Sequence, residues 1–193
     1  MVRLLIPLLF VMLIFTSGCK DKESTPRVKI ILEDDRAIHL ELYRDLAPTT
    51  VDNFLKLVDK NFYDGVIFHR IIMDFMVQAG GFTVEGNQII QKESQKTIKG
   101  EFTNNGFENN LKHTLGVISM ARTSDPNSAS SQFFICTATA IHLDGDYAAF
   151  GKTIDEESNK VLLELNEATT TTIDYLEDFP VPVIKIKTIE RLK

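Results

Sequence analysis

Short runs of hydrophobic residues dominate the chain from residue 28 onward. Between Ala37 and Tyr43, Ile38, Leu40 and Leu42 fall on one face with polar side chains between them, and this period of two predicts a strand with one buried face. A second β-type run at residues 28–32 precedes it, so the two predict a hairpin. Further β-type runs predict strands at residues 66–72, 75–78, 115–121, 132–137, 148–152 and 183–189.

Helical spacing of apolar residues occurs in two segments. Val51, Phe54, Leu55 and Val58 recur three or four positions apart after Pro48, which predicts a helix over residues 48–60. Residues 156–165 predict a second helix, and the threonine run at 169–172 is interpreted as a loop with no special role. The pattern therefore predicts a mainly β fold, a closed antiparallel eight-stranded β-barrel capped by two α-helices.

The N-terminal residues have the pattern of a secretory signal. Arg3 precedes an apolar run at residues 4–15, which is shorter than the roughly twenty residues that a membrane span needs. Gly18 and Cys19 after this run resemble the lipobox of bacterial lipoproteins, although Thr16 stands where that family usually has Leu. The resemblance implies that Cys19 is acylated and becomes the first mature residue. An ordinary secretory signal cut near Gly18, with Cys19 left as a free thiol, is the open alternative.

These features predict three regions along the chain. They are a lipoprotein signal peptide at residues 1–18, the lipidated Cys19 with a polar tether up to residue 27, and one domain at residues 28–193. We expect the domain at the bacterial cell envelope, anchored to a membrane through Cys19. Lys20, rather than Asp, after the cysteine favours the outer membrane, facing the periplasm, in a cell with two membranes.

Charge and side-chain content exclude several classes of function. The chain has 21 Lys and Arg against 27 Asp and Glu, and loss of residues 1–18 with Arg3 leaves 20 against 27, a net charge of -7. We expect no nucleic-acid partner, because such a chain is unsuited to a phosphate backbone and has no glycine-rich phosphate loop. Cys136 has no partner within the chain once Cys19 is lipidated. The dispersed histidines lack Cys or carboxylate neighbours at ligand spacing, so neither a metal nor another cofactor is expected.

The most informative stretch runs from Phe68 to Phe82. Taken alone, Arg70 in its apolar strand is interpreted as an outward-pointing charge, because arginine is mostly exposed. The strand is apolar on both faces, however, and a barrel of this size is filled by its own side chains. We therefore expect one face to cover the interior and the other to lay Phe and Met side chains onto an outer groove.

Two motifs resemble the cyclophilin family of peptidyl-prolyl cis-trans isomerases. The first is FHRII at residues 68–72, followed by Phe75, Met76, Gln78 and two glycines. The second begins with SMART at residues 119–123 and, after a loop, continues with SQFFI at 131–135, LDG at 143–145 and FGK at 150–152. Order and approximate spacing hold from residue 28 to 192, so the resemblance covers essentially the whole mature chain.

The resemblance implies a role for each matching residue. It implies that Arg70 is the catalytic arginine beside a proline pocket. It also implies that the backbone of Arg122 binds the substrate chain. The pocket lining would be Phe75, Met76, Phe134 and Leu143, with polar contacts from Gln78 and Gln132 and a neighbouring subsite at Ala121 and Thr123.

Three departures from the family pattern change details of this expectation. Met73 and Asp74 replace a frequent Pro-Gly, which is expected to change a bulge between two strand halves. Tyr147 stands where many members have His, and it still offers a ring and a hydroxyl as a substrate-binding residue. His142, also expected to bind substrate, takes the place of a Trp associated with cyclosporin binding, so we expect weak drug binding.

The predicted function is that of a monomeric isomerase that rotates X-Pro bonds in exported polypeptides and assists their folding. Rotation requires neither a nucleophile nor an acid-base pair, so an apolar pocket and one fixed donor suffice. The alternative is a binding module or holdase that recognises proline-containing segments with little turnover. Arg70 distinguishes the two, because a pure binder needs the pocket but no catalytic donor.

Overall fold

The structure, a computed structural model, describes residues 25–86, 88–93 and 95–192. The signal peptide predicted at residues 1–18 and the predicted lipidation site Cys19 lie outside these ranges. The strands are β1 Arg27–Leu32, β2 Ala37–Leu42, β3 Val66–Ile72, β4 Met76–Glu85, β5 Gln88–Gln91, β6 Val117–Met120, β7 Phe133–Cys136, β8 Ala149–Thr153, β9 Thr170–Ile173, β10 Leu176–Pro180 and β11 Ile184–Leu192. The α-helices are α1 Pro48–Val58 and α2 Glu156–Asn166, and short 3₁₀ turns lie at Thr103–Asn105 and Ile141–Leu143.

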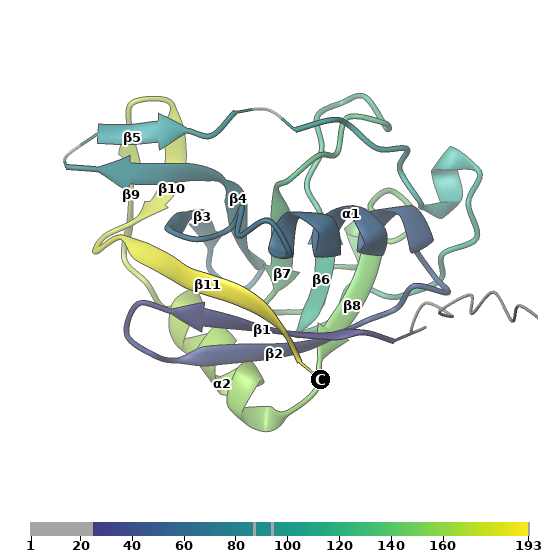
Figure 1. Ribbon diagram of the computed structural model, residues 1–193, viewed down its shortest axis with the longest axis horizontal. Coiled ribbons are helices and arrows are strands. Elements are labelled where there is room, and N and C mark those ends of the chain that lie inside the picture. Colours follow the sequence, from purple (N-terminus) through teal and green to yellow (C-terminus); the bar gives the residue numbers. More distant parts are fainter. Residues whose placement is uncertain (1–24, 87, 94, 193) are drawn as a thin grey trace, which may run out of the picture.

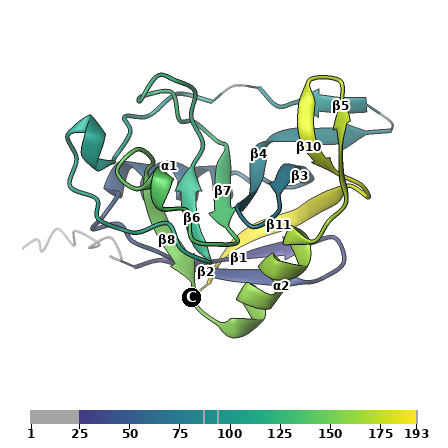
Figure 2. The same ribbon diagram turned by 180° about the vertical axis from the view of Figure 1, so that it is seen from behind.

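Eight of the strands close into an antiparallel barrel (Figure 1). They follow the order β3, β11, β1, β2, β8, β6, β7 and β4, and β4 pairs back onto β3. Strand β5 extends the sheet from β4 outside this ring, and β9 pairs only with β10. The helices α1 and α2 lie at opposite ends of the barrel (Figures 1 and 2). The predicted eight-stranded barrel with two helices is therefore confirmed.

The hydrophobic pattern of the strands explains how the barrel is filled. Ile38, Leu40 and Leu42 of β2 are all fully buried, as their alternation predicts, and β1 buries every second residue in the same way. Four rings meet at the centre: Phe54 of α1 packs against Tyr63, Phe133 and Phe150 with ring centroids 5.2–5.6 Å apart. The apolar stripe of α1 thus closes one end of the barrel.

A carboxylate from a distant loop caps the start of α1. Ala47 at the N-cap offers no side-chain hydrogen bond, but Glu101 accepts hydrogen bonds from the backbone N–H groups of Thr49 and Thr50 at 2.9 and 2.8 Å. The Thr50 hydroxyl donates to the same carboxylate at 2.7 Å. Glu101 is 2% exposed, so the oxygens of a buried carboxyl group satisfy N–H groups that the helix itself leaves unpaired.

The C-terminal region differs from the sequence prediction. The threonine run at residues 169–172, predicted to be a loop, contributes β9, which pairs with β10 in a separate hairpin. Threonine favours strands, and the hairpin is fixed by Phe179, which is 1% exposed and packs with Ile67 and Phe82 of the barrel. The first strand also begins one residue earlier than predicted, because Arg27 pairs with Glu41 and Leu192.

Candidate active site

A pocket of about 220 Å³ opens on the outer face of the barrel. Its apolar walls are Phe75, Met76, Phe134 and Leu143, of which the last three are only 3%, 5% and 6% exposed. Met76, Phe134 and Leu143 form a hydrophobic cluster separate from the main core, with Phe75 packed against it. These side chains therefore line the pocket with a closely packed apolar surface.

Strand register places the pocket residues on one face of the sheet. Arg70 of β3 pairs with Gln78 of β4, and Gln78 pairs in turn with Phe134 of β7 (Figure 2 shows these strands side by side). Directly paired residues of antiparallel strands project to the same side, so the three form a row across the outer face. The intervening Val77 and Ile135 project into the main core. This arrangement agrees with the expectation of an interior face and an outer groove.

Nine of the twelve predicted substrate-site residues line the pocket itself. They are Arg70, Phe75, Met76, Gln78, Ala121, Arg122, Phe134, Leu143 and Tyr147. The other three lie beside it. Gln132 accepts a hydrogen bond from Gln78 at 2.9 Å, and the His142 ring lies 5.1 Å from that of Phe75. Thr123 lies in the following loop, where its N–H donates to the Ser128 hydroxyl at 2.9 Å.

Two arginines shape the polar edge of the pocket. The Arg122 guanidinium lies 4.6 Å from the centroid of the Tyr147 ring, and its Nε donates to the Asp146 carbonyl at 3.0 Å, so it holds this aromatic wall. Arg70 Nε donates to Asp178 Oδ2 at 3.3 Å. Its side chain is 41% exposed, which leaves the guanidinium open to a bound ligand. The contact with Asp178 has no counterpart in the sequence prediction.

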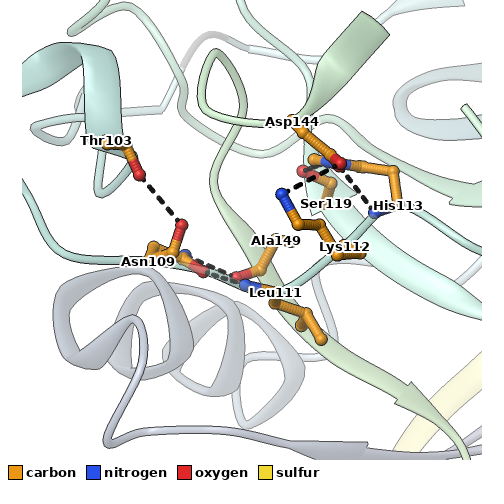
Figure 3. Close-up of polar contacts among 8 residues, drawn as sticks. All are labelled: Thr103, Asn109, Leu111, Lys112, His113, Ser119, Asp144 and Ala149. Carbon is orange, nitrogen blue, oxygen red and sulfur yellow. Dashed lines mark hydrogen bonds and ion pairs between the residues drawn. The ribbon is translucent and has the colours of Figure 1, made fainter. Parts of the chain in front are cut away.

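A polar network adjoins two walls of the pocket, and Figure 3 shows the side chains of the network. Asp144 Oδ1 accepts hydrogen bonds from the backbone N–H of His113 at 2.9 Å and from its Nδ1 at 3.0 Å, and His113 Nε2 lies 3.2 Å from the Ser119 hydroxyl. The His113 ring stacks on Phe134 at 6.1 Å, and Asp144 directly follows Leu143. Ser119 is fully buried, so these three residue types cannot act on a substrate as a hydrolase triad would.

Burial controls ionisation around this network. Burial lowers the pKa of His113, against the opposing effect of Asp144, so the ring is neutral and its Nδ1–H donates to the carboxylate. Burial alone would raise the pKa of Asp144, but hydrogen bonds from His113 and Lys112 keep it below its usual value. Cys136 lies in the hydrophobic cluster with Met76 and Phe134, and burial raises the pKa of its thiol to about 12. It is a buried core residue, as its sequence context predicts.

Comparison with known proteins identifies the family. The family model described as "Cyclophilin type peptidyl-prolyl cis-trans isomerase/CLD" matches residues 27–191. The chain belongs to this family. A peptidyl-prolyl cis-trans isomerase of Acinetobacter baylyi is 38% identical over 158 residues, which cover 79% of each chain. Peptidyl-prolyl cis-trans isomerase A of Dickeya dadantii is 37% identical over 161 residues, covering 81% of this chain and 80% of the relative.

Solved structures agree with this assignment. The crystal structure of a cyclophilin-type isomerase from Cryptosporidium parvum in the presence of the dipeptide Ala-Pro matches with a TM-score of 0.68 and 28% identity, covering 86% of this chain and 99% of that one. The chain is accordingly a peptidyl-prolyl cis-trans isomerase of the cyclophilin type.

In this cyclophilin-type isomerase, Met73 and Asp74 do not form the bulge expected from their sequence. They lie in the turn that joins β3 to β4, where Asp74 has a φ of +55° and the Phe75 N–H donates to the Ile72 carbonyl at 3.1 Å. Asp is among the residues that tolerate this left-handed conformation. The Asp74 N–H donates to Asn166 at the end of α2 at 2.8 Å, which fixes the turn beside the pocket wall Phe75.

Proposed function

We propose that this isomerase grips the proline ring of its substrate in the apolar pocket and stabilises the twisted amide with Arg70. The observation that carries the proposal is the row of Arg70, Gln78 and Phe134 across three neighbouring strands. This row puts the Arg70 guanidinium and the Phe134 ring on the outer face of the sheet, with Gln78 between them. A proline held against Phe134 therefore has its preceding amide within the region that Arg70 can reach.

The physical chemistry of the reaction fits these groups. Rotation about an X-Pro bond removes amide resonance and has a barrier of about 18–20 kcal/mol. The twisted nitrogen regains a lone pair, and N–H donors aimed at the changed charge distribution favour the twisted amide over the planar one. Arg70 Nε faces Asp178, so the N–H groups on its two terminal nitrogens are the donors that would stabilise the twisted amide.

We further propose that the enzyme acts on exported polypeptides at a bacterial membrane, tethered through acylated Cys19. Support comes from the apolar run at residues 4–15, the Gly18-Cys19 junction and the polar residues that follow. Within the described residues, no helix is both long and apolar enough to cross a membrane.

Membrane fractionation tests the anchor. The wild-type protein should partition with membranes, and Cys19→Ser should leave the chain unprocessed or release it, because the acyl chains can no longer be attached. Wild-type protein that is soluble and unmodified would contradict the anchor.

A proline-limited refolding assay with the same preparations tests the activity separately. Both proteins should accelerate refolding of a polypeptide, because the residues that line the pocket lie between Arg70 and Tyr147 and are unchanged in Cys19→Ser. Peptide binding without acceleration would instead indicate a proline-binding module.

A further inference from the structure

The β9–β10 hairpin brings a carboxylate to the arginine of the proposed mechanism. Phe179 anchors the hairpin in a cluster with Ile67 and Phe82, and Leu176 packs against the edge of the same cluster. Figures 1 and 2 both show the hairpin beside the region of β3, β4 and β5. The hairpin is therefore held by buried apolar contacts, and any polar group on β10 is held with it.

An irregularity in β10 directs Asp178 toward Arg70. Leu176 pairs with Ile173 and Phe179 pairs with Thr171, so β10 has one more residue than β9 over this interval. Asp178 lies in this bulge with a φ of +56°. Bulges re-aim side chains, and here the carboxylate Oδ2 lies 3.3 Å from Arg70 Nε. The bulge therefore accounts for the direction of the Asp178 side chain.

The contact between Arg70 and Asp178 contributes little to the stability of the fold. The side chains of Arg70 and Asp178 are 41% and 38% exposed, and ion pairs with such exposure are screened by water and contribute little to the free energy of unfolding. The contact matters more for the orientation of the Arg70 guanidinium. A free arginine side chain populates many rotamers, and an acceptor at Nε favours the rotamers that face it while the terminal nitrogens stay available to a ligand.

We propose that Asp178 is a positioning residue, which holds the Arg70 guanidinium at the edge of the proline pocket in the orientation that the twisted amide requires. This inference rests on the proposed role of Arg70. It assigns the β9–β10 hairpin a part in catalysis without contact between its residues and the substrate.

The test compares substitutions that suit the backbone at Asp178. Asp178→Gly removes the acceptor without straining a positive φ, and Asp178→Asn keeps an acceptor oxygen and also tolerates this conformation. In the full-length protein, Asp178→Gly should lower kcat/KM for peptide isomerisation about tenfold through kcat, with KM and peptide affinity changed less than about twofold. Asp178→Asn should restore most of the activity.

A matched control is Asp35→Gly. Asp35 also has a positive φ, +66°, and forms an exposed ion pair with Lys187 at 2.8 Å, and neither residue lines the pocket. Asp35→Gly makes the same chemical change as Asp178→Gly, but at a residue that does not contact Arg70. It should therefore keep wild-type kcat/KM. Equal losses in Asp35→Gly and Asp178→Gly would overturn the inference, because they would show a general effect on stability.

A double-mutant cycle separates this inference from the proposed function. In an Arg70→Ala background, Asp178→Gly should have no further effect, since there is no guanidinium left to orient. An additive loss in that background would refute a positioning role for Asp178. If Arg70→Ala alone kept full activity, the proposed mechanism would fail instead. If Arg70→Ala lost activity while Asp178→Gly kept it, only the inference about Asp178 would fail.

Discussion

His69, the neighbour of Arg70 on β3, should make the stability of the barrel depend on pH in the weakly acidic range. The side chain is 3% exposed and its ring lies 4.7 Å from that of Phe82. Burial lowers its pKa from 6.5 to about 4, against the opposing effect of hydrogen bonding to Ile67 and Gln132. Between these two values the unfolded chain binds a proton that the folded protein excludes, so stability falls as the pH decreases.

The magnitude follows from the size of the shift. A difference of about 2.5 pKa units corresponds to about 3 kcal/mol once the pH is below both values, and to about 2 kcal/mol at pH 5 relative to pH 7.5. The pKa values of Asp34, Asp144 and Asp155 are held below 3.8, so loss of their contribution begins at lower pH. His113, whose pKa is also lowered, acts in the same direction as His69. The contribution of His69 must therefore be measured as a difference between variants.

Urea denaturation of wild-type protein and His69→Gln from pH 7.5 to pH 5 provides that difference. Glutamine cannot take up the proton, so the gap in the free energy of unfolding between the two proteins should narrow by about 2 kcal/mol as the pH falls. His142→Gln, which removes an exposed imidazole, is the matched control. A gap that stays constant within about 0.5 kcal/mol across this range would refute the reasoning, because 2 kcal/mol lies well outside that margin.

Three further predictions concern the helix cap and the pocket. Glu101→Ala should lower the free energy of unfolding by about 2–3 kcal/mol in urea denaturation, because it leaves the buried N–H groups of Thr49 and Thr50 unpaired; a loss below about 0.5 kcal/mol would argue against the cap. Phe134→Ala should weaken peptide affinity and kcat/KM by similar factors, about 10–100-fold, because the wall holds proline in both the planar and twisted states; a change in turnover alone would contradict this. His142→Trp should tighten cyclosporin binding in calorimetry, whereas tight binding to the wild type would show that this position does not control the drug.

Periodicity predicts the barrel well because burial in it alternates regularly. The face formed by Ile38, Leu40 and Leu42 is fully buried, and α1 begins at the predicted Pro48. The pocket residues are predicted from the two motifs that resemble the cyclophilin family, and the structure brings these motifs together because β4 lies between the strands of Arg70 and Phe134. Their individual roles remain predictions that the mutations above test.

Contacts between distant segments escaped prediction. Arg70 and Asp178 are 108 positions apart, and their contact depends on a bulge in β10 and on the burial of Phe179. His113 and Asp144 are 31 positions apart, with no shared periodicity. Such pairs depend on how the elements pack, which the local pattern of polar and apolar residues does not encode.

The central claim, that Arg70 stabilises the twisted amide, is tested most directly by Arg70→Ala in full-length protein. Both kcat/KM for an X-Pro peptide and the affinity for that peptide should be measured. The account predicts a loss in kcat/KM of about 10²–10³, equivalent to about 2.7–4 kcal/mol, with a much smaller loss in affinity. Near-normal isomerisation by Arg70→Ala would contradict the account and leave the arginine as a surface charge beside a proline-binding pocket.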